Sequence, residues 1–443
     1  MTLRLLLIRH GLSSFNLENR IQGRSDLSVL TDQGKAQAIA TGKALCGVPI
    51  NAIYSSPLKR AAASSENILK GLQTKLKPIF DEGLLEVDLA QWSGYTIKEL
   101  KENHPEAYKV WEQNPNDLEI TNEAGDTYKP IHELMIQAKD FIQRLILKHP
   151  PGSEENIIIV AHNAILRCIV LVLLGEPKKG FRRIKLDNSS LSVINLIYQE
   201  KNNYTCQIEC LNNTNHLRSS LPPKGKRPRL ILVRHGETDW NLQGRFQGQI
   251  DIPLNINGQE QAIATKNFLK KEKINKAYAS SLSRPILTAK IILKSHPDIE
   301  VELVKELIEI SHGEWEGKLE SEIKERWPEL LRNWKDKPET VQMPEGESIE
   351  DVWGRSIESW NNICNKLKDG DTALIVAHDA VNKTILCHLL GLMPRDIWNI
   401  KQGNGGVSVI DIASNDRQTD VVTCLNLTSH LGNILDCTAA GAL

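Results

Sequence analysis

The stretch from Leu5 to Asn16 reads LLLIRHGLSSFN, and the stretch from Leu230 to Asn241 reads LILVRHGETDWN. Each begins as an apolar run of the kind that forms a buried strand and ends abruptly in Arg-His-Gly. Three further pairs of phrases follow in the same order along the chain. They are AIYSSPLKRAA from Ala52 with AYASSLSRPIL from Ala277, LLEVDLAQWSG from Leu84 with LIEISHGEWEG from Leu307, and IIIVAHNAILRC from Ile157 with ALIVAHDAVNKT from Ala373. A period of roughly 200 residues indicates two complete domains rather than a solenoid of short repeats.

The boundary between the two copies falls in SSLPPKGKRP, a segment rich in proline and basic residues. This composition is typical of a semi-stiff, solvated linker. We therefore predict a first domain over residues 1–218, a linker over 219–228 and a second domain over 229–443. A duplicated domain is also compatible with packing of one copy against the other, or with homodimer formation.

The composition of the chain is that of an ordinary globular protein. It has 443 residues, of which 40% are hydrophobic and 25% charged, and its formal net charge is −1. A charge this close to zero gives no field that attracts nucleic acid. The longest apolar run, Cys168 to Leu174, is far shorter than the roughly 20 residues of a membrane span. We expect a cytoplasmic protein that binds neither nucleic acid nor a membrane, and the scattered cysteines form no zinc set.

Within each copy, short apolar runs alternate with segments of helical periodicity. In the first copy the runs are LRLLLI, AIYSS and NIIIVA, and Thr31 precedes a helical pattern at the place of an N-cap, as Asn255 does in the second copy. This alternation predicts an α/β fold for each domain, with a mostly parallel central sheet flanked by helices. Ligands of such sheets bind beyond the carboxyl ends of the strands.

Residues with acid–base or anion-binding chemistry lie at the ends of predicted strands and in loop segments between elements. They are Arg9, His10, Arg60, Glu86 and His162 in the first copy, and Arg234, His235, Arg284, Glu309 and His378 in the second. Two arginines and two histidines suit a tetrahedral dianion, because guanidinium groups donate in a bidentate way. One neutral imidazole can attack phosphorus and the other can stabilise the phosphoryl oxygens. The glutamate is the candidate acid that protonates the leaving group.

The RHG phrase, the R-x-Q-G loop, the L-x-E segment and the V-A-H phrase, each found twice and in order, resemble the motifs of the histidine phosphatase superfamily, the phosphoglycerate-mutase-like proteins. The resemblance implies that His10 and His235 are phosphorylated nucleophiles. It also implies that the arginines, His162 and His378 bind phosphate, with no metal or organic cofactor. Further implied contacts to phosphate or substrate are Asn16, Gln22 and Gly23 in the first copy, and Asn241, Gln247 and Gly248 in the second.

Three functions are compatible with this pattern. The first is a phosphomonoester phosphatase that acts on a small phosphorylated metabolite through a phosphohistidine. The wording RFQGQIDIPL from Arg245 is similar to that of small phosphatases of the sugar-phosphate or α-ribazole-phosphate type. The second is a cofactor-dependent phosphoglycerate mutase, which uses the same residues.

In the third functional hypothesis, only the second copy is catalytic and the first is a binding or dimerisation module. This hypothesis rests on Leu12 in place of Glu237 and Ala90 in place of Gly313. Because the first copy keeps every histidine, arginine and glutamate of the set, we expect it to be competent, and the second to carry the main activity. Leu134 falls opposite Arg355, so no role of Arg355 is expected to be shared.

Overall fold

The protein is described by a computed structural model that covers residues 2–122, 124–177, 180–199, 204–218, 220–413 and 419–439. The chain divides into two compact units, Met1–Leu217 and Arg218–Leu443, here called the N-terminal and C-terminal units. Ser219, at the start of the predicted linker, and the last four residues of the predicted second domain lie outside the described residues.

The N-terminal unit is built around a six-stranded central sheet with the strand order β8-β7-β1-β6-β2-β3. Its strands are β1 (Thr2–Arg9), β2 (Ala52–Ser55), β3 (Ile79–Phe80), β6 (Asn156–Ala161), β7 (Leu191–Tyr198) and β8 (Tyr204–Asn213), with a separate hairpin of β4 (Ile120–Thr121) and β5 (Thr127–Tyr128). Its helices are α1 (Ser14–Leu17), α2 (Asp32–Ala44), α3 (Lys59–Leu72), α4 (Ile97–Asn103), α5 (Pro105–Gln113), α6 (Pro130–Lys148) and α7 (Asn163–Leu173).

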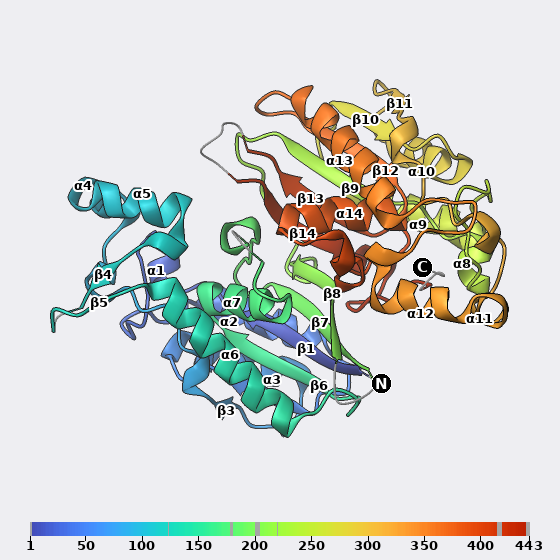
Figure 1. The fold of residues 1–443 in the computed structure, drawn as a ribbon. Coiled ribbons are helices and arrows are strands. Elements are labelled where there is room, and N and C mark those ends of the chain that lie inside the picture. The colour runs from blue at the N-terminus through green and yellow to red at the C-terminus, as the bar shows by residue number, and fades with distance from the viewer. Residues whose placement is uncertain are drawn as a thin grey trace. The chain divides into compact units, whose positions relative to one another are not determined.

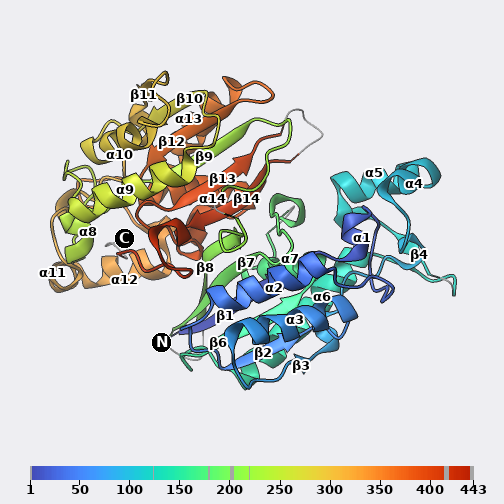
Figure 2. The same ribbon diagram turned by 180° about the vertical axis from the view of Figure 1, so that it is seen from behind.

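Helices cover both faces of this sheet. Figure 1 shows α6 and α7 in front of the strands, and the reverse view in Figure 2 shows α2 and α3 in front of the opposite face. β1, β6, β2 and β3 run parallel, whereas β7 and β8 form an antiparallel edge. The predicted mostly parallel α/β sheet is therefore confirmed, with an antiparallel pair at one side.

The C-terminal unit repeats this architecture with the strand order β11-β10-β12-β9-β13-β14. Its strands are β9 (Arg229–Arg234), β10 (Lys276–Ala279), β11 (Val301–Leu303), β12 (Thr372–Ala377), β13 (Val407–Asp411) and β14 (Val421–Leu427). Its helices are α8 (Asp239–Gln243), α9 (Ile256–Leu269), α10 (Ser283–Leu293), α11 (Glu320–Arg326), α12 (Pro328–Asp336), α13 (Ile349–Asn365) and α14 (Asp379–Leu390). Figures 1 and 2 show α13 and α14 on one face and α9 and α10 on the other.

Local sequence signals set the ends of these elements. The Thr31 side chain accepts a hydrogen bond from the Gly34 amide at the start of α2, and Asn255 does the same for the Gly258 amide at the start of α9. These contacts satisfy amide groups that a helix leaves unpaired in its first turn. The predicted N-caps and all three predicted strands of the first copy are therefore confirmed.

The segment predicted as a linker packs against the C-terminal unit. Leu221 is buried in the core of that unit, next to residues of its sheet. The Lys224 ammonium donates to the Thr372 hydroxyl at 2.8 Å, and the Arg229 guanidinium donates to the Pro222 carbonyl at 2.8 Å. None of the helices in the described ranges is long and apolar enough to cross a membrane.

Candidate active site

Two histidines meet at the carboxyl ends of neighbouring strands in each unit. β1 and β6 are parallel and pair Arg9 with Ala161, so the next residues, His10 and His162, lie side by side with ring centroids 5.1 Å apart. In the C-terminal unit, His235 and His378 follow β9 and β12 in the same way, also 5.1 Å apart. All four are buried. Sheet register alone therefore brings together residues that are far apart in the sequence.

The first histidine of each pair is held in one orientation by its own loop. The Nδ1 atom of His10 lies 2.7 Å from the Gly11 carbonyl oxygen, and Nδ1 of His235 lies 2.7 Å from the Gly236 carbonyl oxygen. A carbonyl can only accept, so Nδ1 of a neutral ring carries the proton. The lone pair of such a ring is then on Nε2, the atom that faces away from this loop.

Burial keeps the first histidines neutral. The pKa of His10 is lowered well below its ordinary value, first by burial and then by the positive charges of Arg60 and Arg9. His235 has a similarly lowered pKa, first because of burial and then because of Arg284 and Arg234. A neutral imidazole at physiological pH has a free lone pair and can act as a nucleophile.

The second histidine of each pair is positioned by a serine. Nε2 of His162 lies 2.8 Å from the Ser56 hydroxyl, and Nε2 of His378 lies 2.8 Å from the Ser280 hydroxyl. Nδ1 of both rings is buried and has no hydrogen-bond partner among the described residues. Burial, as the largest cause, also lowers the pKa of both rings.

The arginines of the N-terminal unit are held by backbone carbonyls, which leaves part of each guanidinium unused. Arg60 donates to the carbonyls of Gly23 at 2.8 Å and Ser25 at 2.9 Å, and Arg9 donates to that of Leu186 at 2.8 Å. The Nε atoms of both arginines are buried without a partner among the described residues. Buried donors without acceptors are costly, so this arrangement favours an anion between them.

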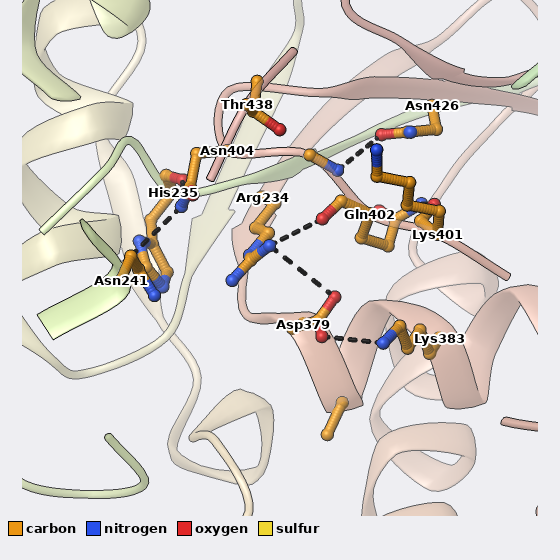
Figure 3. A network of polar contacts seen from close by, with 12 residues as sticks. Arg234, His235, Asn241, Asp379, Lys383, Lys401, Gln402, Asn404, Asn426 and Thr438 are labelled. Atoms are coloured by element: carbon orange, nitrogen blue, oxygen red, sulfur yellow. Dashed lines mark hydrogen bonds and ion pairs between the residues drawn. The ribbon is translucent and has the colours of Figure 1, made fainter. Parts of the chain in front are cut away.

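The C-terminal unit holds its arginines in the same manner. Arg284 donates to the carbonyls of Gly248 at 2.7 Å and Ile250 at 3.0 Å, and its Nε donates to Nε2 of His235 at 3.3 Å. Arg234 donates to the Gln402 carbonyl at 2.6 Å, a contact drawn in Figure 3. Gly23 and Gly248 have φ values of +49° and +54°, in the region where glycine carries no steric cost.

The glutamates cap the helix that begins after the second histidine. Glu86 accepts from the amides of Ala164 at 3.2 Å and Ile165 at 3.1 Å, in the first turn of α7. Glu309 accepts from the Asp379 amide at 3.0 Å, at the start of α14. Burial and the nearby Asp379 carboxylate raise the pKa of Glu309. A raised pKa suits a group that must carry a proton near neutral pH.

The predicted glutamines hydrogen-bond to the residue that caps the first short helix of each unit, Ser13 before α1 and Thr238 before α8. Ser13 donates to Gln22 at 3.0 Å in the N-terminal unit, and Thr238 donates to Gln247 at 2.9 Å in the other. The Gln247 amide nitrogen is buried and unpartnered within the described part of the chain. It is therefore a further free donor.

An asparagine that the sequence analysis did not single out completes each site. The Asn188 amide donates to the His10 carbonyl and to the Asn16 side chain, both at 3.0 Å. Asn404 donates to the His235 carbonyl at 3.1 Å and to Asn241 at 3.3 Å, as Figure 3 shows. The available signal was the pattern K-x-x-N-x-x-x-S-V-I, which begins at Lys185 in one copy and at Lys401 in the other and runs into the strands β7 and β13.

The expectation that no role of Arg355 is shared between the copies is wrong. Arg355 donates to the carbonyls of Glu306 and Ile308, which precede Glu309. In the N-terminal unit Gln137 donates to the corresponding carbonyls of Gly83 at 3.1 Å and Leu85 at 2.9 Å. The alignment placed Leu134 opposite Arg355, but the residue that takes over the role of Arg355 is Gln137, one helical turn further along α6.

The difference between Leu12 and Glu237 lies away from the paired histidines. Both backbone amides donate to a helix glutamine, Gln37 or Gln261, at 2.9 and 2.8 Å. The Glu237 carboxylate accepts from the Asn255 side chain at 3.0 Å and lines a cavity of about 320 Å³. None of the paired histidines or their arginines lines this cavity.

Each unit thus brings together neutral histidines and arginines, and the Nε atoms of Arg9, Arg60 and Arg234 have no acceptor among the described residues. Such a set binds a tetrahedral dianion and disfavours a cation. No group of three or more His, Cys, Asp or Glu side chains within the described ranges is placed to hold a metal ion.

Comparison with known proteins follows the same division of the chain. A family model described as the histidine phosphatase superfamily (branch 1) matches residues 5–213 and 230–424. A 2-carboxy-D-arabinitol-1-phosphatase of Triticum aestivum is 29% identical, covering 97% of this chain and 86% of that protein. Phosphoserine phosphatase 1 of Hydrogenobacter thermophilus is 35% identical over 46% of this chain and 94% of its own length. A 2,3-bisphosphoglycerate-dependent phosphoglycerate mutase of Cytophaga hutchinsonii is 32% identical over 42% of this chain and 89% of its own length.

Proposed function

Because the chain belongs to branch 1 of the histidine phosphatase superfamily, we propose that it is a phosphomonoester phosphatase with one phosphohistidine-forming site in each unit. The observation that carries the proposal is the state of His10 and His235. Each is a buried, neutral ring whose Nδ1 is tied to a carbonyl, which places the lone pair on Nε2. In His235 this atom accepts from Nε of Arg284, a donor that an incoming phosphoryl group would take over. The surrounding arginines supply the positive charge that a phosphoryl group needs.

In the first step, Nε2 of His10 or His235 forms a bond to phosphorus as the ester bond to the leaving oxygen breaks. The arginines and Nδ1 of the second histidine donate to the phosphoryl oxygens. A hydroxyl proton of Ser56 or Ser280 directed at Nε2 would place the ring proton on Nδ1, where it can make this contact. The histidine pair therefore divides the work between attack and charge stabilisation.

The leaving oxygen needs a proton, and Glu86 or Glu309 is our candidate donor. In the second step, water attacks the phosphohistidine, the phosphorus–nitrogen bond breaks, and the water proton returns to the carboxylate. Inorganic phosphate leaves and the neutral histidine is restored, so atoms and charges balance over the cycle. The raised pKa of Glu309 supports this role in the C-terminal unit.

The substrate class is a small phosphorylated metabolite. The relatives are named for 2-carboxy-D-arabinitol 1-phosphate, phosphoserine and phosphoglycerate chemistry, and all three names describe small molecules with a phosphoryl group. The mutase relative supports a second candidate, in which the phosphohistidine passes its phosphoryl group to another hydroxyl instead of water. Retention of the full residue set in both units supports activity in each, in preference to a purely binding role for the N-terminal unit.

The test compares the full chain with His10→Ala, His235→Ala and the double variant. Phosphate release from a metabolite panel is measured, together with phosphoglycerate interconversion with and without 2,3-bisphosphoglycerate. We expect each single variant to keep part of the hydrolysis, the double variant to lose it, and rapid quenching to trap an acid-labile phosphohistidine. Hydrolysis that persists in the double variant would refute the mechanism. Interconversion faster than hydrolysis would favour the mutase.

A further inference from the structure

The helix that follows the second histidine carries a neutralised ion pair in the C-terminal unit. Asp379 and Lys383, one turn apart on α14, are almost fully buried and lie 2.8 Å apart. Asp379 also lies 3.9 Å from the Arg234 guanidinium. Figure 3 shows the three side chains in a row, with Asp379 between the two cations. The positive charge of Lys383 is thus cancelled beside Arg234.

The same helix positions in the N-terminal unit carry no acid. Asn163 and Arg167 stand on α7 where Asp379 and Lys383 stand on α14. Arg167 has no carboxylate within ion-pair distance among the described residues, and its Nε is buried without a partner. Burial and the charges of Arg182 and Arg9 lower the pKa of Arg167 to about 9. Arg167 and Arg182 also lie over the same aromatic ring, with their guanidinium carbons 5.3 and 5.7 Å from the centroid of Phe181.

Arg182 is a second cation that the C-terminal unit lacks. It donates to the Trp111 carbonyl and lies 4.8 Å from the centroid of that indole ring. In the C-terminal unit the corresponding carbonyl, that of Trp334, accepts instead from the neutral indole of Trp398 at 3.0 Å. One structural hydrogen bond is thus kept in both units, while the charge of its donor differs.

One lysine–aspartate pair beside the sites is common to both units. In the N-terminal unit Lys185 pairs with Asp187 at 3.5 Å, and in the C-terminal unit Lys401 pairs with Asp436 at 3.2 Å. These pairs cancel in both units. On the helix after the second histidine and in the turn that follows it, the N-terminal unit thus has the cations Arg167 and Arg182 where the C-terminal unit has an internally cancelled ion pair and a tryptophan, and Arg183 stands where the C-terminal unit has Asn399.

From this difference, we infer that the N-terminal site selects phosphomonoesters that carry a second anionic group, whereas the C-terminal site accepts those that do not. Arg167 and Arg182 form the anion subsite of the N-terminal unit, and its ligand is a carboxylate or a second phosphate on the substrate. The inference rests on the proposed phosphatase function. It assigns different substrates to the two units of one chain.

The physical reason is that a part-buried cation without a counter-ion gains more from an anion than a paired cation does. A hydrogen bond to a charged group contributes about 1.5–3 kcal/mol, so a second anionic group should raise kcat/KM about 10- to 100-fold in the N-terminal unit. In the C-terminal unit the Asp379 carboxylate already occupies the cations and repels a further anion. We expect little or negative discrimination there.

The experiment uses the full chain with one nucleophile removed, His235→Ala for the N-terminal site and His10→Ala for the C-terminal site. Two matched substrate pairs separate the sources of the second charge. 3-Phosphoglycerate is compared with glycerol 3-phosphate for a carboxylate, and fructose 1,6-bisphosphate with fructose 6-phosphate for a phosphate. The readout is the ratio of kcat/KM within each pair. Because both members share the same chemical step, effects on the acid or nucleophile cancel from the ratio.

Reciprocal exchange variants make the test specific. Asn163→Asp in the His235→Ala chain should give Arg167 a counter-ion and lower the preference for the doubly anionic substrate about tenfold. Asp379→Asn in the His10→Ala chain should expose the charge of Lys383 and raise that preference. Because Asp379 also raises the pKa of Glu309, this variant changes kcat for both members of a pair. Thermal unfolding of each variant checks that the unit is folded.

The outcomes separate this inference from the proposed function. Equal ratios in the two single variants, or ratios that the exchanges leave unchanged, would overturn the inference while leaving the phosphatase intact. If Asn163→Asp lowers kcat/KM to the same degree for both substrates of a pair, the residue has only a structural role, and the inference is overturned. Hydrolysis that survives removal of both nucleophiles would defeat the proposed function itself. If the His235→Ala chain hydrolyses none of the substrates, both the N-terminal activity and its subsite are refuted.

Discussion

Replacing Arg355 by alanine should weaken the C-terminal unit and its site while sparing the N-terminal site. The Arg355 side chain donates to both carboxylate oxygens of Glu347, at 2.9 and 3.0 Å. It also donates to the carbonyls of Glu306 at 2.7 Å and Glu309 at 3.1 Å. The guanidinium therefore ties the segment that carries the candidate acid to helix α13.

The cost of the substitution lies between the limits for surface and buried ion pairs. Breaking a buried pair costs about 3–5 kcal/mol and an exposed pair about 0–1 kcal/mol. Arg355 and Glu347 are 17% and 24% exposed, and Glu347 keeps the Ser311 amide as a donor at 2.9 Å. We therefore expect a loss of about 2 kcal/mol in the free energy of unfolding of this unit. For a domain of this size, the corresponding fall in Tm is about 4–8 °C.

The assay follows urea inactivation of the His10→Ala chain, in which hydrolysis reports on the C-terminal site alone. The matched control is Gln137→Ala in the His235→Ala chain, which removes two hydrogen bonds to carbonyls and an exposed one from the Arg24 guanidinium and should cost about 1 kcal/mol. The kcat of the C-terminal site should also fall about tenfold, because the segment that carries Glu309 loses a support and one catalytic contact is displaced. An unchanged free energy of unfolding, or an equal loss at both sites after Arg355→Ala, would refute the reasoning.

Three further predictions address single contacts. Ser280→Ala should lower the kcat of the C-terminal site about tenfold with little change in KM, because His378 loses the partner that fixes its ring. Single-turnover kinetics of the His10→Ala chain measure this change. An effect confined to KM would contradict the prediction. Burial lowers the pKa of His312 to about 3. The neutral ring therefore contributes its full stabilisation above about pH 6.5, and this contribution to the free energy of unfolding is lost as the pH falls below that value. At pH 5.5 the loss is about 1.4 kcal/mol. His312→Leu, which copies the first unit, should remove this loss in urea denaturation at pH 7.5 and 5.5. Gly313→Ala should lower the free energy of unfolding by more than about 2 kcal/mol, as measured by thermal unfolding. The φ of Gly313 is +54°, and an added Cβ would lie 1.9 Å from the Pro344 carbonyl oxygen. The matched change in the other unit, Ala90→Gly, should alter the free energy of unfolding by less than about 1 kcal/mol.

The fold and the centre of the site were predictable because each buried strand is recognisable as an apolar run and the residues that follow it lie at a known edge of the sheet. An apolar run followed by Arg9 and His10, and a second run followed by His162, place those residues at one edge of a parallel sheet. This inference needs only the direction of the strands. The repeated order of the phrases then identifies the same positions in the second unit, including Glu309 beside its helix.

The supporting contacts were not predictable because their partners change place along the chain. Gln137 and Arg355 hold the same segment from helix positions that do not align. Asp187 stands two residues after its lysine in the sequence, whereas Asp436 stands 35 residues after Lys401. A carboxylate can act from any segment that folds to within about 3 Å of its partner, so sequence spacing does not constrain it.

Joining the units Met1–Leu217 and Arg218–Leu443 in one polypeptide fixes the ratio of their sites at synthesis. Two separate enzymes can be made in any proportion, but these two sites are always present in equal numbers. The relative flux through them is then set by the kcat/KM of each site and by substrate supply. On the proposed function, changes in expression would alter both fluxes together, so the balance between the two reactions would be set by side chains such as Arg167 and Asp379 and not by gene dosage.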